Sequence, residues 1–89
     1  MAVMVVADVP NQTQQGYDGM LAMLESGIRK APGFVMHSAH ATTDGWRVIE
    51  IWESSRHASE YFAQYVHPNL PPGIKPRRTV QELHSLVRP

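Results

Sequence analysis

The sequence predicts an α+β protein with the ferredoxin-like order βαββαβ, in which two helices cover one face of a four-stranded antiparallel sheet. Strand-like runs and helical patterns follow one another along the chain in that order. The two middle strands flank an Asp44-Gly45 turn, a strong hairpin signal because both turn residues tolerate positive φ. Right-handed crossovers then place both helices on the same face of the sheet.

The composition fits one domain over residues 1–89. Lys plus Arg and Asp plus Glu number eight each, so no basic excess supports a nucleic-acid partner, and Lys75, Arg77 and Arg78 are interpreted as a solvated loop. The absence of cysteine excludes disulfides and fits a reducing cytoplasm. Asp8 interrupts the apolar N-terminus, so we expect no signal peptide, no membrane partner and a soluble, cytoplasmic protein.

The first strand and the first helix are expected on either side of a short break. Residues 2–9 are almost continuously apolar, which predicts a strand buried on both faces. Thr13 or Asn11 can cap the following helix, which Pro32-Gly33 ends. The helix has one apolar stripe, formed by Tyr17, Met20, Leu21, Leu24 and Ile28.

The hairpin strands are expected at Phe34–Thr42 and Trp46–Glu53. Strict alternation places Phe34 and Met36 on the same face of the first of them. In the second strand, one face carries Trp46, Val48, Glu50 and Trp52, and the other carries Arg47, Ile49, Ile51 and Glu53.

A second helix begins after Ser54, which is a good N-cap, and cannot run far past His67 because Pro68 follows. Its apolar stripe consists of Ala58, Tyr61, Phe62, Tyr65 and Val66. Residues 69–76 form a proline-rich connector. The last strand is expected over Arg77 to Val87, with a β-bulge between Val80 and Leu83 where the apolar phase slips.

The first and third strands are the most apolar and therefore central. Helices cover only one face of the sheet, so the other apolar face needs a second cover. The simplest cover is a second copy of the same sheet, which predicts a homodimer with Ile49 and Ile51 buried at the interface.

Several motifs resemble the antibiotic biosynthesis monooxygenase-like family of dimeric α+β-barrel proteins. They are APGF at Ala31–Phe34, the histidine His37 three residues after Phe34, DGW at the hairpin tip, and IxxWES at Ile49–Ser54. The resemblance implies a homodimeric α+β barrel with a pocket between sheet and helices. Members include cofactor-free quinone-forming monooxygenases and haem-degrading oxygenases, and related barrels include cyclases and isomerases.

Carried over residue by residue, the resemblance is incomplete. Trp52 matches the tryptophan that lines the pocket of the quinone-forming enzymes, but their asparagine on the same strand falls near Val48. The haem-degrading members need an asparagine on the first strand, where this chain offers Ala7 or Asp8.

Haem-degrading members also have a tryptophan in the second helix and a histidine after it. The helix position falls near Tyr61, and His67 comes too early to match the histidine. The resemblance therefore disfavours haem degradation.

Glu50 and Trp52 project from one face of a central strand, the pocket face if the tryptophan match holds. A desolvated carboxylate there suits a general base or acid, although a structural ion pair is the plainer interpretation. His37 and His40 lie three residues apart and face opposite sides of a regular strand, so they cannot share a metal ion and no metal site is predicted. The family pattern favours His37 for the pocket.

His57, Tyr61 and Tyr65 form one row on the second helix, where they either pack or bind a ligand. The sequence thus predicts a cofactor-independent monooxygenase acting on an aromatic or polyketide-like small molecule. Glu50 and His37 are the expected catalytic residues. The expected substrate-binding residues are Trp52, Tyr61, Tyr65, His40 and His57. A non-catalytic binding or stress-associated module and a proton-transferring cyclase or isomerase are the alternatives.

Overall fold

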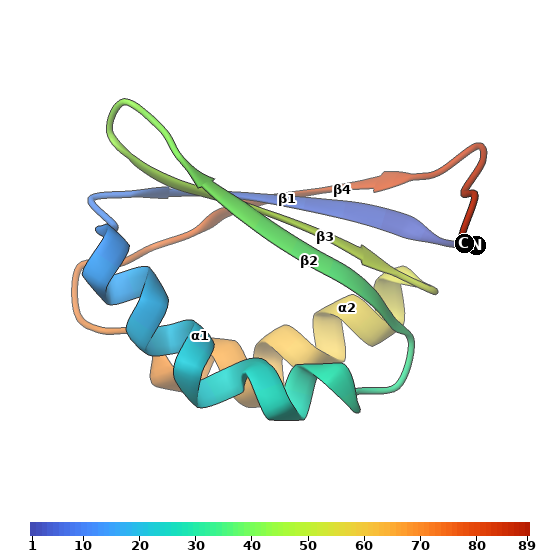
Figure 1. Ribbon diagram of the computed structural model, residues 1–89, viewed down its shortest axis with the longest axis horizontal. Coiled ribbons are helices and arrows are strands. Elements are labelled where there is room, and N and C mark those ends of the chain that lie inside the picture. The colour runs from blue at the N-terminus through green and yellow to red at the C-terminus, as the bar shows by residue number, and fades with distance from the viewer.

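A computed structural model describes residues 1–89 and confirms the α+β ferredoxin-like fold class. Its strands are β1 (Val3–Pro10), β2 (Phe34–Ala41), β3 (Gly45–Trp52) and β4 (Arg77–Glu82). Its helices are α1 (Gln14–Arg29) and α2 (Ser55–Tyr61), and α2 continues into the short segments η1 (Phe62–Val66) and η2 (His67–Asn69). Both helices cover the same face of the sheet, and the two termini lie at the same end of the molecule (Figure 1).

The sheet has the strand order β2-β3-β1-β4 with every neighbouring pair antiparallel, so the two most apolar strands are central as predicted. Its register aligns side chains in rows that cross the sheet on the helix side. One row consists of His37, Glu50, Val5 and Val80. The adjacent row consists of Ala39, Val48, Ala7 and Arg78. A histidine, a carboxylate and a guanidinium therefore start from neighbouring rows of the same face.

A register shift between Phe34 and Met36 makes Val35 an extra residue in β2. Phe34 consequently pairs with Trp52 and meets its ring edge-on at a centroid distance of 5.5 Å, on the same face as His37. Strict alternation had placed Phe34 on the opposite face, so the bulge changes which residues gather around Trp52.

The bulge expected in the last strand is absent, because β4 pairs with β1 in regular register from Arg77 to Glu82 and ends there. The phase slip at Leu83 reflects the end of the strand: Leu83 donates its main-chain N–H to the carbonyl of Ala2, and residues 83–87 lie beyond the sheet.

The hairpin turn also differs from the expectation. β3 already begins at Gly45, and the main-chain N–H of Thr42 donates to the Gly45 carbonyl over 2.9 Å. Neither Asp44 nor Gly45 has a positive φ. Gly45 faces Pro10 across β1 and β3, and a Cβ there would overlap the carbonyl oxygen of Val9. The glycine thus permits a close approach of two backbones, not a left-handed turn.

Side-chain caps begin both helices as predicted. The Thr13 hydroxyl accepts from the N–H of Gly16 over 3.0 Å, and the Ser54 hydroxyl accepts from the N–H of His57 over 3.1 Å. Gly33, with φ of 80°, carries the chain from α1 into β2. No local sequence pattern predicts that α2 widens into one π-helical turn before Pro68 ends it.

The core lies between the sheet and the helices, and its six buried residues are Val3, Val5, Ile28, Trp52, Ala58 and Tyr61. The other face of the sheet carries partly exposed apolar side chains, namely Met4, Val6, Met36, Ile49 and Ile51. A single chain therefore buries β1 on one face only. None of the helices has both the length and the apolar character that crossing a bilayer requires.

Candidate functional site

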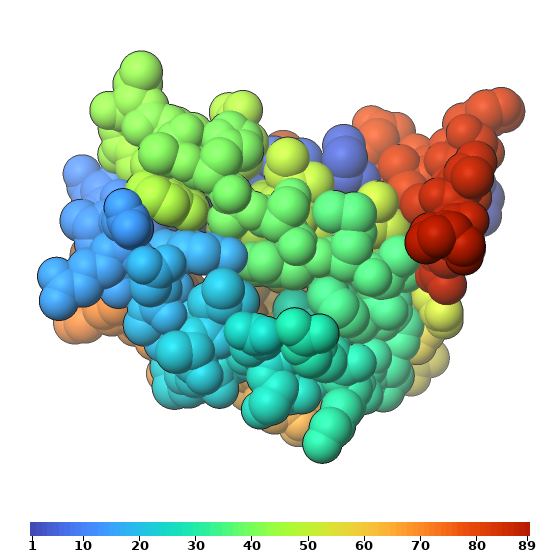
Figure 2. Space-filling view, in the orientation of Figure 1, coloured from blue at the N-terminus to red at the C-terminus, as the bar shows by residue number.

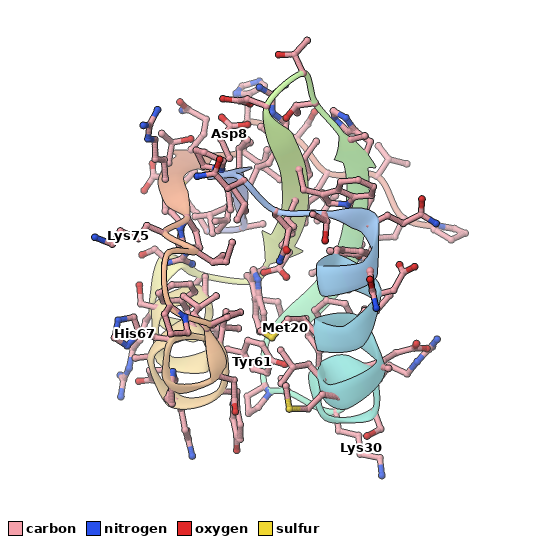
Figure 3. All side chains as sticks on the ribbon, turned by 90° about the vertical axis from the view of Figure 1, so that its left-hand side faces the viewer. Asp8, Met20, Lys30, Tyr61, His67 and Lys75 are labelled. Carbon is pink, nitrogen blue, oxygen red and sulfur yellow. The ribbon has the colours of Figure 1, made fainter.

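An apolar cavity of about 110 Å³ lies between the helix-facing side of the sheet and the helices. Its floor includes Val5, Ala7 and Val48, and its walls come from α1, η1 and the connector before β4. Side chains of α1 meet β2 along one flank of the molecule, as the space-filling view shows (Figure 2). Met20 of α1 and Tyr61 of α2 point into the space between the helices, whereas Lys30, His67 and Lys75 point away from it (Figure 3).

Four side chains form a continuous hydrogen-bonded chain along one side of this cavity. Nε2 of His37 lies 2.6 Å from the hydroxyl oxygen of Tyr17, and Nδ1 lies 2.7 Å from Oε2 of Glu50. The indole Nε1–H of Trp52 donates to Oε1 of Glu50 over 2.9 Å. Only 18% of the His37 side chain and 16% of the Glu50 side chain are exposed. The chain is therefore largely shielded from water.

One arrangement of protons satisfies every contact when His37 is neutral. Ionised Glu50 accepts from Nδ1–H of His37 and from Trp52, which leaves Nε2 free to accept from the hydroxyl of Tyr17. This is the logic of a base that is oriented by a carboxylate. When Nε2 takes up a proton, His37 becomes an imidazolium, and the negative charge of Glu50 stabilises that cation.

Tyr17 is the member of this chain that the sequence did not reveal as a functional residue. It belongs to the apolar stripe of α1 and lies twenty residues from His37, so no local motif links the two. Its ring stacks on His37 at 6.0 Å and on Trp46 at 5.8 Å. Burial, followed by the negative charges of Asp18, Glu50 and Glu25, raises the pKa of Tyr17. The phenol therefore keeps its proton at neutral pH.

Two further donors reach the cavity without a partner. The indole Nε1 of Trp46 and the hydroxyl of Tyr61 are buried and make no hydrogen bond, and both residues line the cavity. Burial and the charge of Glu50 raise the pKa of Tyr61, so its hydroxyl also stays protonated. Unpaired buried donors are costly and rare in native proteins. Their position indicates a site that receives hydrogen-bond acceptors.

Arg78 brings a positive charge to the opposite side of the cavity. Its guanidinium lies 4.0 Å from the centre of the Phe62 ring, and no carboxylate oxygen is within 4.0 Å of it. Burial lowers the pKa of Arg78, and the charge of Glu50 partly opposes this effect. The expectation that Arg78 belongs to a solvated loop is therefore wrong, because its register in β4 directs it to the helix side.

The remaining expected site residues are divided between the cavity and other places. Trp52 is fully buried and does not line the cavity; it donates a hydrogen bond to Glu50, and its ring lies 5.2 Å from that of Tyr61 at a tilt of 35°. Tyr61 lines the cavity, as do His37 and Glu50. In this geometry Trp52 contacts Glu50 and does not form a wall of the cavity.

Three expected ligand contacts lie outside the cavity. His40 is exposed on the other face of β2, where its Nδ1 lies 3.0 Å from the carbonyl oxygen of Ala41. Nδ1 of His57 lies 2.8 Å from the hydroxyl of Ser54, beside Gly33. Tyr65 is 46% exposed and lies in the π-helical turn after Tyr61, and its ring remains 5.2 Å from the ring of Tyr61 at a tilt of 37°.

No three His, Asp or Glu side chains come together as ligands for one metal ion. Beside His37, only Glu50 offers a carboxylate in the cavity lining, and both of its oxygens already accept hydrogen bonds. The donor set does not fit a metal centre.

The structure is similar to solved structures that include a cofactor-independent oxygenase and a haem degrader, and these similarities confirm the ferredoxin-like α+β fold. SnoaB, a cofactor-independent oxygenase from Streptomyces nogalater, is 14% identical, with 97% of this chain and 96% of that chain covered and a TM-score of 0.69. MhuD, a haem degrader from Mycobacterium tuberculosis, is 15% identical, with 99% and 100% covered and a TM-score of 0.63. Rv0793 from the same organism is 18% identical, with 99% and 100% covered and a TM-score of 0.61.

No protein-family model and no curated protein sequence matches the chain. At such low identity the likeness to solved structures establishes the fold, and the chemistry has to be argued from the site.

Proposed function

We propose that the protein binds a small aromatic molecule in the cavity and removes a proton from it with the His37–Glu50 pair, as the first step of a cofactor-independent oxygenation. The observation that carries this proposal is the hydrogen-bonded chain from Tyr17 through His37 and Glu50 to Trp52 beside an apolar cavity. The similarity to SnoaB supports the same class of reaction.

In this mechanism the proton moves along the hydrogen-bonded side chains of Tyr17 and His37. A C–H or O–H group of the ligand gives its proton to the oxygen of Tyr17 while the Tyr17 proton passes to Nε2 of His37, 2.6 Å away. Tyr17 stays neutral, His37 becomes an imidazolium, and Glu50 stabilises that charge at 2.7 Å. The ligand is left as an anion in apolar surroundings.

Molecular oxygen is the co-reactant in the next step. The ligand anion reduces O₂ and combines with it to give a hydroperoxide, to which His37 returns the proton. Loss of water converts the former CH₂ carbon, or the former ring C–H carbon of a phenol, into a carbonyl, so the substrate and O₂ yield a ketone or quinone and one water. The protein supplies the base and the cavity, and the electrons come from the substrate.

The two alternatives use the same cavity. A cyclase or isomerase would remove the proton and return it without oxygen, and a binding module would leave the ligand unchanged. Haem degradation is compatible with the fold because MhuD shares it. A cavity of about 110 Å³ and a His67 that points away from it give haem less support.

The test combines oxygen uptake with proton exchange on a panel of phenols, hydroquinones and anthrones. We expect oxygen uptake by the wild type, a loss of about 10²- to 10⁴-fold on His37→Gln, and a smaller loss on Glu50→Gln. His84→Gln is the control, because His84 is exposed outside the cavity. Exchange of substrate protons with D₂O in the absence of oxygen uptake would indicate the isomerase, and binding alone would indicate the module. An unchanged rate in His37→Gln would contradict the proposed base.

We also propose that the protein is a homodimer that pairs the open faces of two sheets. This face is apolar at Met4, Val6, Ile49 and Ile51, and each of these side chains is partly exposed in the single chain. A second copy would bury both sets at once through a two-fold, self-complementary contact.

A cytoplasmic location is part of the same proposal, since the chain carries no cysteine.

A further inference from the structure

We propose that the ligand of this cavity is a single-ring aromatic carboxylic acid, and that Arg78 binds its carboxylate. This inference deepens the proposed function and rests on it for the fate of the ligand. The recognition of the acid stands on separate observations, which are the unpaired guanidinium, the unpaired donors and the size of the cavity.

Arg78 is a charged group that makes no direct ion pair. It lies partly buried in the cavity lining, with its guanidinium carbon over the Phe62 ring at 4.0 Å from the centroid, and none of the four ion pairs of the chain includes it. The guanidinium is planar and presents its N–H groups in a rigid fork, and the contact with the ring leaves those groups without a protein acceptor. A carboxylate fits such a fork with two parallel hydrogen bonds and supplies the missing charge.

The other polar groups of the cavity favour the same kind of ligand. Trp46 Nε1 and the Tyr61 hydroxyl can each donate a hydrogen bond and lack a partner. The strongest acceptor, Glu50, has both oxygens occupied by His37 and Trp52. Free donors therefore outnumber free acceptors, which suits a ligand rich in acceptor oxygens. A cationic ligand would meet Arg78 with the same sign of charge.

The size and the floor of the cavity limit the body of the ligand. Its volume of about 110 Å³ is close to the roughly 150 Å³ of an apolar protein cavity that holds benzene. Ala7 and Val48 lie in the same cross-sheet row as Arg78, and their small side chains leave room above the sheet. A ring lying there would place its carboxylate at Arg78 on β4 and its far edge toward His37 on β2, the opposite edge strand, and toward Tyr17 on α1.

The test compares an acid with its neutral isostere. Calorimetry or NMR titration with 4-hydroxybenzoate and 4-hydroxybenzamide on the full chain should show the acid binding at least about tenfold more tightly, the smallest effect expected of a charge-assisted pair. Arg78→Gln should weaken binding of the acid by the same factor and leave the affinity for the amide almost unchanged. Arg77→Gln is the matched control, because Arg77 is exposed and faces the other side of β4. 1-Naphthoate, with two rings, should bind more weakly than the single-ring acid.

Equal affinity for acid and amide in the wild type, no binding of either, or an unchanged acid affinity in Arg78→Gln would each overturn the inference. If Arg78→Gln does not fold, Arg78→Lys keeps the charge without the fork and should retain only part of the preference for the acid. Arg78-dependent binding of the acid without oxygen uptake would leave this inference standing and remove the proposed oxygenation. His37-dependent oxygen uptake with equal binding of acid and amide would support the proposed oxygenation and overturn the inference about Arg78.

Discussion

Replacing Trp52 by phenylalanine should destabilise the protein much more than the same replacement of Trp46. The two tryptophans are the only ones in the chain and lie on the same face of β3. Trp52 is fully buried and donates a hydrogen bond of 2.9 Å to the carboxylate of Glu50. The indole nitrogen of Trp46 is buried without a partner. The same chemical change therefore breaks a bond at one site and removes an unpaired donor at the other.

The magnitudes follow from these contacts. Losing a hydrogen bond to a charged group costs about 1.5–3 kcal/mol of unfolding free energy, and the cavity left in the fully buried site adds about 1 kcal/mol. Trp46→Phe also loses packing, but it removes an unsatisfied donor whose burial costs about 1–3 kcal/mol, so its net effect should stay within about 1 kcal/mol. The expected difference is about 2–4 kcal/mol, a large part of the total stability of a domain this small.

Urea unfolding followed by far-UV circular dichroism measures both variants with the same probe, which tryptophan fluorescence would not do. Protein concentration has to be equal in all samples, because dimerisation would make the midpoint depend on it. We expect a lower urea midpoint for Trp52→Phe with an unchanged slope. A double-mutant cycle with Glu50→Gln should give a coupling between Trp52 and Glu50 of about 1–3 kcal/mol. Equal destabilisation by the two replacements would refute the assignment of the Trp52–Glu50 bond.

Three further predictions concern pH, assembly and backbone packing. Burial raises the pKa of Tyr17, so its neutral phenol contributes fully to stability below a pH of about 10, and this contribution is lost as the pH rises through the folded pKa. Between pH 9 and 11 the unfolding free energy of Tyr17→Phe should therefore fall less than that of the wild type, by about 1 kcal/mol. Urea midpoints at several pH values measure this difference. Ile51→Lys should yield monomers in sedimentation velocity while Met23→Lys, on the exposed side of α1, sediments like the wild type; a monomeric wild type would end the dimer proposal. Gly45→Ala should cost about 1–3 kcal/mol because its Cβ overlaps a carbonyl oxygen of β1, whereas Gly19→Ala, with open space around it in α1, should stabilise by about 1 kcal/mol; thermal unfolding of both variants checks the opposite signs.

Local sequence patterns were sufficient to predict the order of the elements. Thr13 and Ser54 cap their helices through hydrogen bonds to residues only three positions further along, so the capping signal lies entirely within a short segment. The apolar runs of β1 and β3 identified the two central strands, because only a strand covered on both sides can be so apolar. These features depend on the chain within a few residues of each position.

The composition of the site was only partly predictable. Glu50 was expected in the pocket because it shares a face of β3 with Trp52, the residue matched to the family's pocket tryptophan. Tyr61 was expected from its place on α2 and His37 from the family pattern, and all three line the cavity. Tyr65 was expected from the same helical row and does not line this cavity: it is 46% exposed, although its ring still contacts that of Tyr61. Periodicity shows which residues share a helix face, and it does not show which of them reach a given cavity.

The chemical connections within the site were decided by the tertiary structure. The pairing of His37 with Glu50 needs one particular register of β2 on β3, and the bulge at Val35 helps to fix it. The contact of Tyr17 with His37 needs α1 packed against β2, and the access of Arg78 to the cavity needs the register of β4 on β1. The sequence by itself determined which segments become strands and helices, because short-range sterics, caps and periodicity act locally. Which side chains meet across the fold depends on register and packing between segments that are distant along the chain, and no local pattern encodes those distances.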